Sequence, residues 1–309
     1  MKKRAFIYVI LAGILWGTSG IFVHYLSPYG FTTIQMTAAR GAVCFVCLAI
    51  FALVKDRKLF RTNVVDILLF VGLGVALFFT GSCYFTSMQL TSVSTAVVLM
   101  YTAPVYVMIF SVLFLGERFS RLKLASVFCV LIGCCLVSGL VGGFKLDIKG
   151  ILIGAASGVA YASYNIFSKI AMRRGFNPIA ATMYGSLFMT LIALVVAKPS
   201  DIVKNTAARP TVIIPLLLGI GVFTFILPYF FYTSSLRELP AGTASALSVV
   251  EPMAATVFSV LLFREKLSVF SVVGIALILL AVCLLGLAES KCGESDGIRG
   301  RKNEKEWRK

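Results

Sequence analysis

Apolar residues fall into long, unbroken runs along this chain, and short polar segments separate one run from the next. Most runs reach the length of about 20 residues that a helix needs to cross a bilayer. None shows the alternation of apolar and polar positions that marks the strands of a membrane barrel. The runs therefore predict ten transmembrane helices, at residues 5–26, 31–54, 64–87, 93–115, 122–141, 150–170, 178–197, 211–233, 241–263 and 269–288.

The second half of the chain repeats the first. Residues 93–120 and 241–268 follow one pattern, an apolar run with a proline near its middle and a charged turn at its end. The matching pairs are Thr95 and Thr243, Ala96 and Ala244, Pro104 and Pro252, Phe110 and Phe258, Ser111 and Ser259, Glu117 and Glu265, Ser120 and Ser268, and, earlier in each half, Gly13 and Gly158, Trp16 and Tyr161, Phe22 and Phe167, Gly30 and Gly175. We therefore expect two five-helix halves, residues 1–143 and 144–288.

Five helices per half is an odd number, so the second half starts on the opposite side of the membrane from the first. The predicted fold is an all-α integral membrane protein with two inverted five-helix repeats. Inverted repeats are typical of transporters, in which pseudo-symmetric halves surround a site near the bilayer midplane. The polar, basic tail at 289–309 has the composition of a disordered segment.

Composition supports a membrane protein and excludes other classes. The chain is 59% hydrophobic and 14% charged, against about 45–50% and about 25% in soluble domains. Its net charge of +16 does not indicate nucleic-acid binding, because Lys and Arg lie between the apolar runs and in the tail. With the N-terminus inside, 21 of the 29 basic residues are cytoplasmic. We expect both termini in the cytoplasm and a multi-pass protein of the plasma or inner membrane.

Neither a metal nor a cofactor is expected. Seven of the eight cysteines lie within apolar runs, where cysteine acts as a small hydrophobe. Cys44 and Cys47 have zinc-like spacing, but no second pair follows and His24 is the sole histidine. A membrane-embedded enzyme would need clustered His, Asp or Glu at membrane depth, and the chain also lacks a nucleotide-binding loop. The sequence therefore predicts that the protein is not an enzyme.

An ordered set of motifs resembles the drug/metabolite transporter superfamily, in its EamA-like ten-helix branch. The residues that carry the resemblance are the stretches Ala12–Gly17, Ala38–Arg40, Thr95–Ala96 with Pro104, Leu115–Arg118, Glu251–Pro252 and Phe263–Lys266. Arg264 departs from the glycine that is common in the family at that turn. The resemblance implies export of amino acids, other metabolites or drugs, driven by the proton gradient.

Glu251 is the main candidate for function. It replaces Ala103 of the first repeat and lies about ten residues into its predicted helix, near the bilayer midplane. A charged carboxylate at that depth costs about 2.5–3.5 kcal/mol on insertion scales, so such residues usually face a protein interior or a wet cavity. Glu251 is either a carboxylate that binds protons or a cationic substrate, or a structural partner of an arginine or of the kink. We expect helix kinks at Pro104 and Pro252.

Other candidates surround this carboxylate in the expected site. Arg40 is the second deep charge, with a structural ion pair and binding of a substrate anion as its two interpretations. Trp16 and Tyr161 are repeat equivalents and are expected to line a central cavity; packing or interfacial roles are the alternative. Further candidates with the same two interpretations are Tyr84, Tyr101, Asn165 and Tyr232. His24 is expected at the surface, and Glu117 and Glu265 in charge-paired turns.

The predicted function is secondary transport, with export of small amphipathic solutes as two inverted halves rock about a midplane site. The partners expected are a small-molecule substrate, the lipid bilayer and protons. The alternative is a membrane receptor or assembly protein without transport activity. The sequence leaves open the substrate, the direction, the coupling ion and the oligomeric state.

Overall fold

The computed structural model describes residues 2–91, 93–116, 121–137, 147–264 and 268–285. Its regular elements are helical throughout this part of the chain. The first repeat contains α1 (Lys2–Gly17), α2 (Ser19–Leu26), α3 (Thr33–Lys55), α4 (Val64–Leu90), α5 (Val93–Met100), α6 (Ala103–Leu115) and α7 (Arg121–Val137). The second contains α8 (Ile148–Arg173), α9 (Pro178–Val196), α10 (Pro199–Ala208), α11 (Pro210–Gly221), α12 (Leu227–Ser235), α13 (Ala241–Leu247), α14 (Val250–Phe263) and a last helix, Val269–Leu285. Short 3₁₀ turns follow α2 and α3, at Ser27–Tyr29 and Arg57–Phe60.

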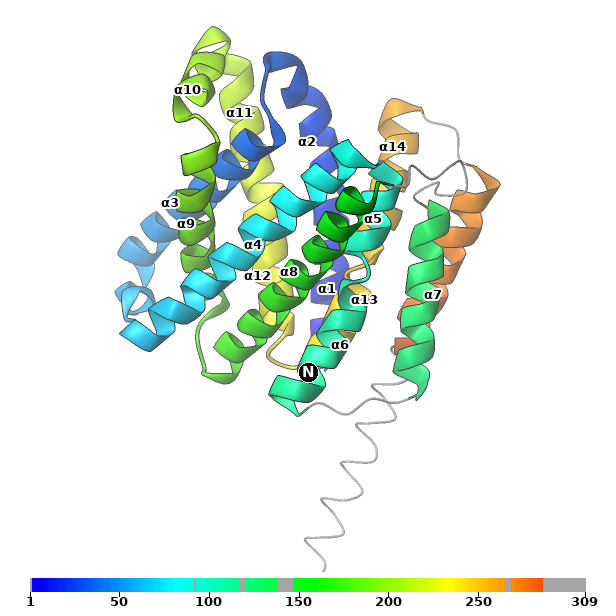
Figure 1. Ribbon diagram of the computed structural model, residues 1–309. Coiled ribbons are helices and arrows are strands. Elements are labelled where there is room, and N and C mark those ends of the chain that lie inside the picture. Colours follow the sequence, from blue (N-terminus) through cyan, green and yellow to red (C-terminus); the bar gives the residue numbers. More distant parts are fainter. Residues whose placement is uncertain (1, 92, 117–120, 138–146, 265–267, 286–309) are drawn as a thin grey trace, which may run out of the picture.

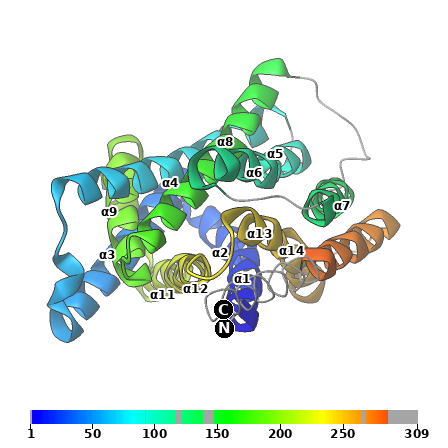
Figure 2. The same ribbon diagram turned by 90° about the horizontal axis from the view of Figure 1, so that it is seen from below.

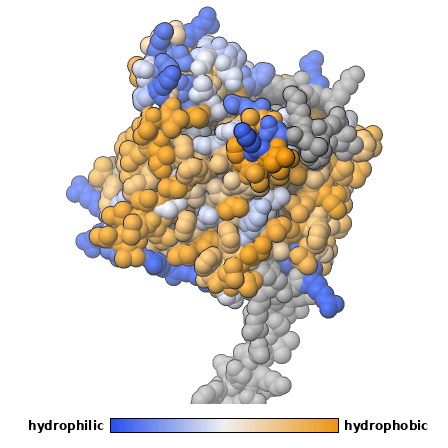
Figure 3. All heavy atoms as spheres, viewed as in Figure 1, coloured by the Kyte–Doolittle hydropathy of each residue, from blue (hydrophilic) through white to orange (hydrophobic). Residues whose placement is uncertain are grey.

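Within the described residues, eight helices or helix pairs are long and apolar enough to cross a membrane, and the last helix adds a shorter apolar segment. The all-α membrane fold predicted from the apolar runs is confirmed. The inner end is defined here as the end where α1 starts and where α6, α8 and α12 finish; the outer end carries α2 and α10 (Figure 1). Figure 3 shows apolar side chains across the body of the molecule, with hydrophilic ones towards its ends, as expected for a bilayer belt.

Four of the spans are interrupted rather than continuous. The fourth span of each repeat breaks just before its proline, at Tyr101–Thr102 between α5 and α6 and at Ser248–Val249 between α13 and α14. The first span breaks at Thr18, and a π-helix, Val222–Ile226, separates α11 from α12. The predicted kinks at Pro104 and Pro252 therefore coincide with matching breaks in both repeats, because proline cannot donate a backbone hydrogen bond.

The two repeats interlock instead of forming separate bundles. The first helix of each repeat packs on the third and fourth spans of the other: α1 lies against α12 and α14, and α8 lies against α4, α5 and α6 (Figure 2). The second spans, α3 and α9, pack on each other. Contacts between consecutive spans such as α3 and α4 are sparse by comparison. Each half of the sequence therefore packs more extensively on the other half than within itself.

Small residues allow the closest of these approaches. A methyl group added at Gly158 of α8 would lie 2.9 Å from the Leu99 carbonyl oxygen, at the break between α5 and α6. A methyl group at Gly13, the repeat equivalent in α1, would lie 3.2 Å from the Val250 Cβ at the break between α13 and α14. The repeat seen in the sequence is thus reproduced in three dimensions: in both cases a glycine faces the interrupted fourth span of the other repeat.

Candidate functional site

Glu251 lies in the first turn of α14, directly after the interruption. The Glu251 amide donates a 3.0 Å hydrogen bond to the Ser248 carbonyl, a tight turn that closes the gap left by Pro252. Its side chain is only partly buried although residues 241–250 before it are all buried. The break therefore places the carboxyl group of Glu251 inside the bundle, next to the interruption of the span.

Helix α1 packs directly against the backbone of Glu251. A methyl group at Gly17 would lie 3.1 Å from the Glu251 carbonyl oxygen and 2.8 Å from the Ala254 Cβ. Gly13 is equally close, 3.3 Å from the Glu251 amide nitrogen by the same construction. Glycine at both positions lets α1 and α14 cross at Glu251, which brings the neighbouring Trp16 to the same region.

An aromatic cluster fills the space between α1, α8 and α12. The Trp16 ring centroid is 5.1 Å from that of Tyr229 and 5.4 Å from that of Tyr232. Tyr164 joins them, with its centroid 5.4 Å from Tyr229 and 6.2 Å from the stacked ring of Tyr161. Edge-on and offset contacts of this kind stabilise aromatic clusters beyond their buried area. Trp16 and Tyr161, predicted to share a cavity, are brought to one cluster.

Polar groups of α8 connect this cluster to α12 and to the break before Glu251. The Tyr161 hydroxyl and the Ser248 Oγ are 3.2 Å apart. The Asn165 amide donates to the Tyr161 carbonyl at 2.6 Å, and the Tyr232 hydroxyl donates to the Asn165 Oδ1. Asn165 is therefore held at both ends of its amide, which fixes the orientation of Tyr232.

Tyr84 of α4 and Tyr101, at the break between α5 and α6, also lie near Glu251. Both hydroxyls are within electrostatic range of its carboxyl group. The Tyr101 hydroxyl is buried and interacts with Glu251, but it lacks a hydrogen bond of standard geometry within the described chain. The Trp16 Nε1 is a second buried donor without a partner among the described residues. The indole N–H of Trp16 is therefore available to an acceptor that enters the site.

Arg40 approaches the site from α3. Its guanidinium carbon lies 5.6 Å from the centroid of the Phe225 ring, a cation–π contact with the π-helix. Arg40 is within electrostatic range of Glu251, but these two described side chains do not form an ion pair. The structural ion pair between Arg40 and Glu251 is therefore not formed directly. The guanidinium group lies near the carboxylate without contacting it.

We refer to these residues together as the central site. Its members are Trp16, Arg40, Tyr84, Tyr101, Tyr161, Asn165, Tyr229, Tyr232, Ser248 and Glu251. The structure brings all eight predicted candidates together here, although contact alone leaves their roles as predictions. His24 is exposed, as expected. Glu117 and Glu265 and the tail lie outside the described residues.

Sequence reasoning missed Tyr164, Phe225 and Tyr229. Tyr164 and Tyr229 are aromatic residues in apolar spans that offer no distinguishing signal. Phe225 belongs to the π-helix, where five residues wind differently from the helix on either side. Such π-bulges are frequent at functional sites, and Pro228 just beyond it is the one available sequence signal.

A small cavity of about 10 Å³ lies beside the central site, between α4, α8, α9 and α12. The Ser168 and Thr182 hydroxyls line it, are buried, and have no hydrogen-bond partner in the described chain. The Tyr164 and Thr233 hydroxyls, 3.3 Å apart, also line it. Its volume is about that of one water-sized probe.

The fourth spans of the two repeats contact each other at the inner end of the described bundle. On the inner side, α6 packs against α13, the corresponding element of the other repeat. On the outer side the described parts of α5 and α14 make no comparable contact, and α7 touches both.

Comparison with known proteins shows which family this chain resembles. The sequence profile of the EamA-like transporter family matches the chain twice, at residues 3–139 and 148–287. An uncharacterized transporter of Clostridium kluyveri is 27% identical, with 90% of this chain and 91% of that protein covered. The uncharacterized transporter YwfM of Bacillus subtilis is 26% identical over 92% and 94% of the two chains.

The fold is also known from experiment. A solved crystal structure superposes with a TM-score of 0.74 at 17% identity, covering 94% of this chain and 99% of the other. At that identity the likeness shows the fold alone. The two profile matches span nearly the whole described chain and agree with its multi-pass helical membrane architecture. The chain belongs to the EamA-like transporter family.

Proposed function

We propose that this protein is a secondary-active transporter that exports amino acids or similar small amphipathic solutes and uses Glu251 as the proton-coupling carboxylate. Family membership supports transport as the general activity. The observation that carries the finer proposal is the chemistry of the central site, where one carboxylate lies near the Tyr101 hydroxyl, the guanidinium of Arg40 and the buried indole N–H of Trp16.

The site offers complementary groups for a zwitterion. Glu251 can accept hydrogen bonds from an ammonium group, and the aromatic rings around it favour a cation. The carboxylate of such a substrate can accept hydrogen bonds from the Trp16 Nε1, the Tyr101 hydroxyl and the nearby Arg40. A neutral amino acid carries both groups on one carbon and would leave its side chain to the aromatic cluster.

Proton coupling follows from competition for Glu251. A carboxylate deep in a membrane bundle is stable either protonated or paired with a cation. Binding of the substrate's ammonium group would require Glu251 to be ionised, and its departure would favour reprotonation. Solute and proton would then occupy the site alternately, which is the requirement for antiport.

Transport in purified proteoliposomes tests this proposal. Vesicles with an acidic lumen would be offered labelled neutral amino acids and labelled lipophilic cations, with nigericin-treated and protein-free vesicles as controls. Accumulation of an amino acid that nigericin abolishes is the expected result. Accumulation of the cations alone would refute the zwitterion chemistry, and the absence of any flux would refute the assigned activity.

A further inference from the structure

The interlocked repeats define two mixed groups of helices. In the first group, α8 is packed closely on α4, α5 and α6 through its row of glycines. In the second group, α1 is packed closely on α12 and α14. By contrast, α8 meets α12 and α13 over only a few residues. We call this thin junction the α8 seam.

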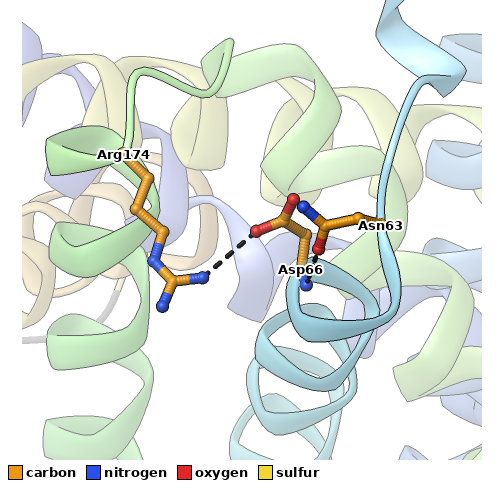
Figure 4. Close-up of polar contacts among 3 residues, drawn as sticks. All are labelled: Asn63, Asp66 and Arg174. Carbon is orange, nitrogen blue, oxygen red and sulfur yellow. Dashed lines mark hydrogen bonds and ion pairs between the residues drawn. The ribbon is translucent and has the colours of Figure 1, made fainter.

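Polar contacts at the inner end strengthen the first group, and one of them also joins the two groups, where Arg237 beyond α12 donates to the Phe176 carbonyl beyond α8 at 3.1 Å. Arg174 pairs with Asp66 at 3.1 Å, and Asn63 accepts from the Asp66 amide to cap α4 (Figure 4). Arg173 donates to the Leu115 carbonyl at the end of α6 at 2.9 Å. These bonds hold α8 to α4 and α6, which already pack along their lengths.

The α8 seam itself is held by a row of polar side chains. Tyr161, Asn165 and Lys169 recur every four residues and therefore share one helix face. Tyr161 meets Ser248 and Asn165 meets Tyr232, as described above. Lys169 is the row's innermost member, one turn closer to the inner end.

Lys169 closes the seam with a buried charge. Its Nζ donates to the Leu236 carbonyl at 2.6 Å and to the Leu239 carbonyl at 2.6 Å, just beyond the end of α12. Its side chain is only 7% exposed. Carbonyl groups at a helix C-terminus carry partial negative charge, so the ammonium group ties α8 to the end of α12.

The repeat supplies an independent indication of a conformational role. At the spacing that pairs Phe22 with Phe167 and Gly30 with Gly175, the counterpart of Lys169 is His24. His24 lies near the outer end and is exposed, whereas Lys169 is buried. The equivalent positions of the two repeats therefore differ: Lys169 is buried at the inner end and His24 is exposed at the outer end. The packing of α6 on α13 is also at the inner end.

We propose that Lys169 is the inner latch of the transport cycle: its two hydrogen bonds to the end of α12 hold the α8 seam shut, and they break when the central site opens to the inner side. This inference rests on the proposed transport function. Its test is independent of that function, because the accessibility of the α8 seam can be measured without a substrate.

The experiment measures labelling of single cysteines from either side of the membrane, in a full-length background without other cysteines. Thr233→Cys reports on the inner half of the seam, where Thr233 is buried against Tyr164. Ala255→Cys reports on the outer half of α14, one turn outward from Glu251, where α14 packs against Gly17 of α1. Each reporter is combined with Lys169→Met, with Lys169→Arg, and with Lys149→Met as a matched control at the exposed start of α8.

Lys169→Met should raise inner labelling of Thr233→Cys by about tenfold or more, because one charge-assisted hydrogen bond is enough for that factor. Outer labelling of Ala255→Cys should fall in the same variant. Lys169→Arg should keep most of the protection, and Lys149→Met should change neither rate. If labelling rises at both reporters, Lys169 only stabilises the fold. If neither labelling rate changes, Lys169 does not hold the α8 seam shut. Either result overturns the latch.

Discussion

The crossing of α1 and α14 at Glu251 makes Gly17→Ala a sharp test of the central site. The added methyl group would lie 2.8 Å from the Ala254 Cβ, 2.9 Å from the Ala255 amide nitrogen and 3.1 Å from the Glu251 carbonyl oxygen. Two of these atoms are backbone and the third is fixed to it, so no side chain can swing aside. Helices α1 and α14 must therefore move apart.

The expected cost follows from two opposing terms. Overpacking of a close contact costs about 1–3 kcal/mol, and alanine gains about 1 kcal/mol over glycine in a helix. Gly20→Ala is a matched control, because a methyl group there meets nothing within 4 Å. The helix gain is common to both variants, so their free energies of unfolding should differ by about 1–3 kcal/mol.

Thermal unfolding of both purified variants in one detergent measures this difference. We expect Gly20→Ala to unfold at or slightly above the wild-type temperature and Gly17→Ala several degrees below the control. Solute flux through Gly17→Ala should also fall, because Glu251 is displaced. If Gly17→Ala unfolds at the same temperature as Gly20→Ala, α1 does not lie against α14 as described, and the placement of Glu251 is wrong.

Three further variants test other parts of the structure. Asn165→Leu leaves the buried Tyr232 hydroxyl without its acceptor, so unfolding should be easier by about 1–3 kcal/mol, measured by thermal denaturation; no change would exclude the bond. Asp66→Asn removes a partly exposed ion pair with Arg174 and should cost less than about 1 kcal/mol, with flux unchanged; loss of flux would show that this pair moves during transport. Pro252→Ala restores a backbone donor at the break and should slow transport more than it destabilises the protein; flux equal to wild type would show that the break is not needed for movement.

The sequence predicted those features that depend on local pattern. Apolar runs located the spans within a few residues, and Pro104 and Pro252 marked both central breaks. The carboxylate of Glu251 stood out because an apolar helix rarely carries one. Helix α10 was not predicted, because its ten residues, Pro199–Ala208, lack an apolar run.

Features that depend on long-range packing could not be predicted in this way. The repeat showed that the halves are related, but not that α1 would pack on α12 and α14 of the other repeat. Lys169 looked like a flanking cytoplasmic charge, because sequence alone does not show the carbonyl groups beyond α12 that receive it. The π-helix also depends on tertiary context, since residues 222–226 read as ordinary apolar helix.

The most direct test of the central claim is a comparison of wild type and Glu251→Gln in proteoliposomes, with Asp201→Asn as a control on the exposed face of α10. Flux driven by an acidic lumen and exchange at equal pH would be measured with the same labelled solute. The account predicts that Glu251→Gln loses driven accumulation and retains exchange, while Asp201→Asn keeps both. Full driven accumulation by Glu251→Gln would contradict the assignment of this carboxylate as the coupling group.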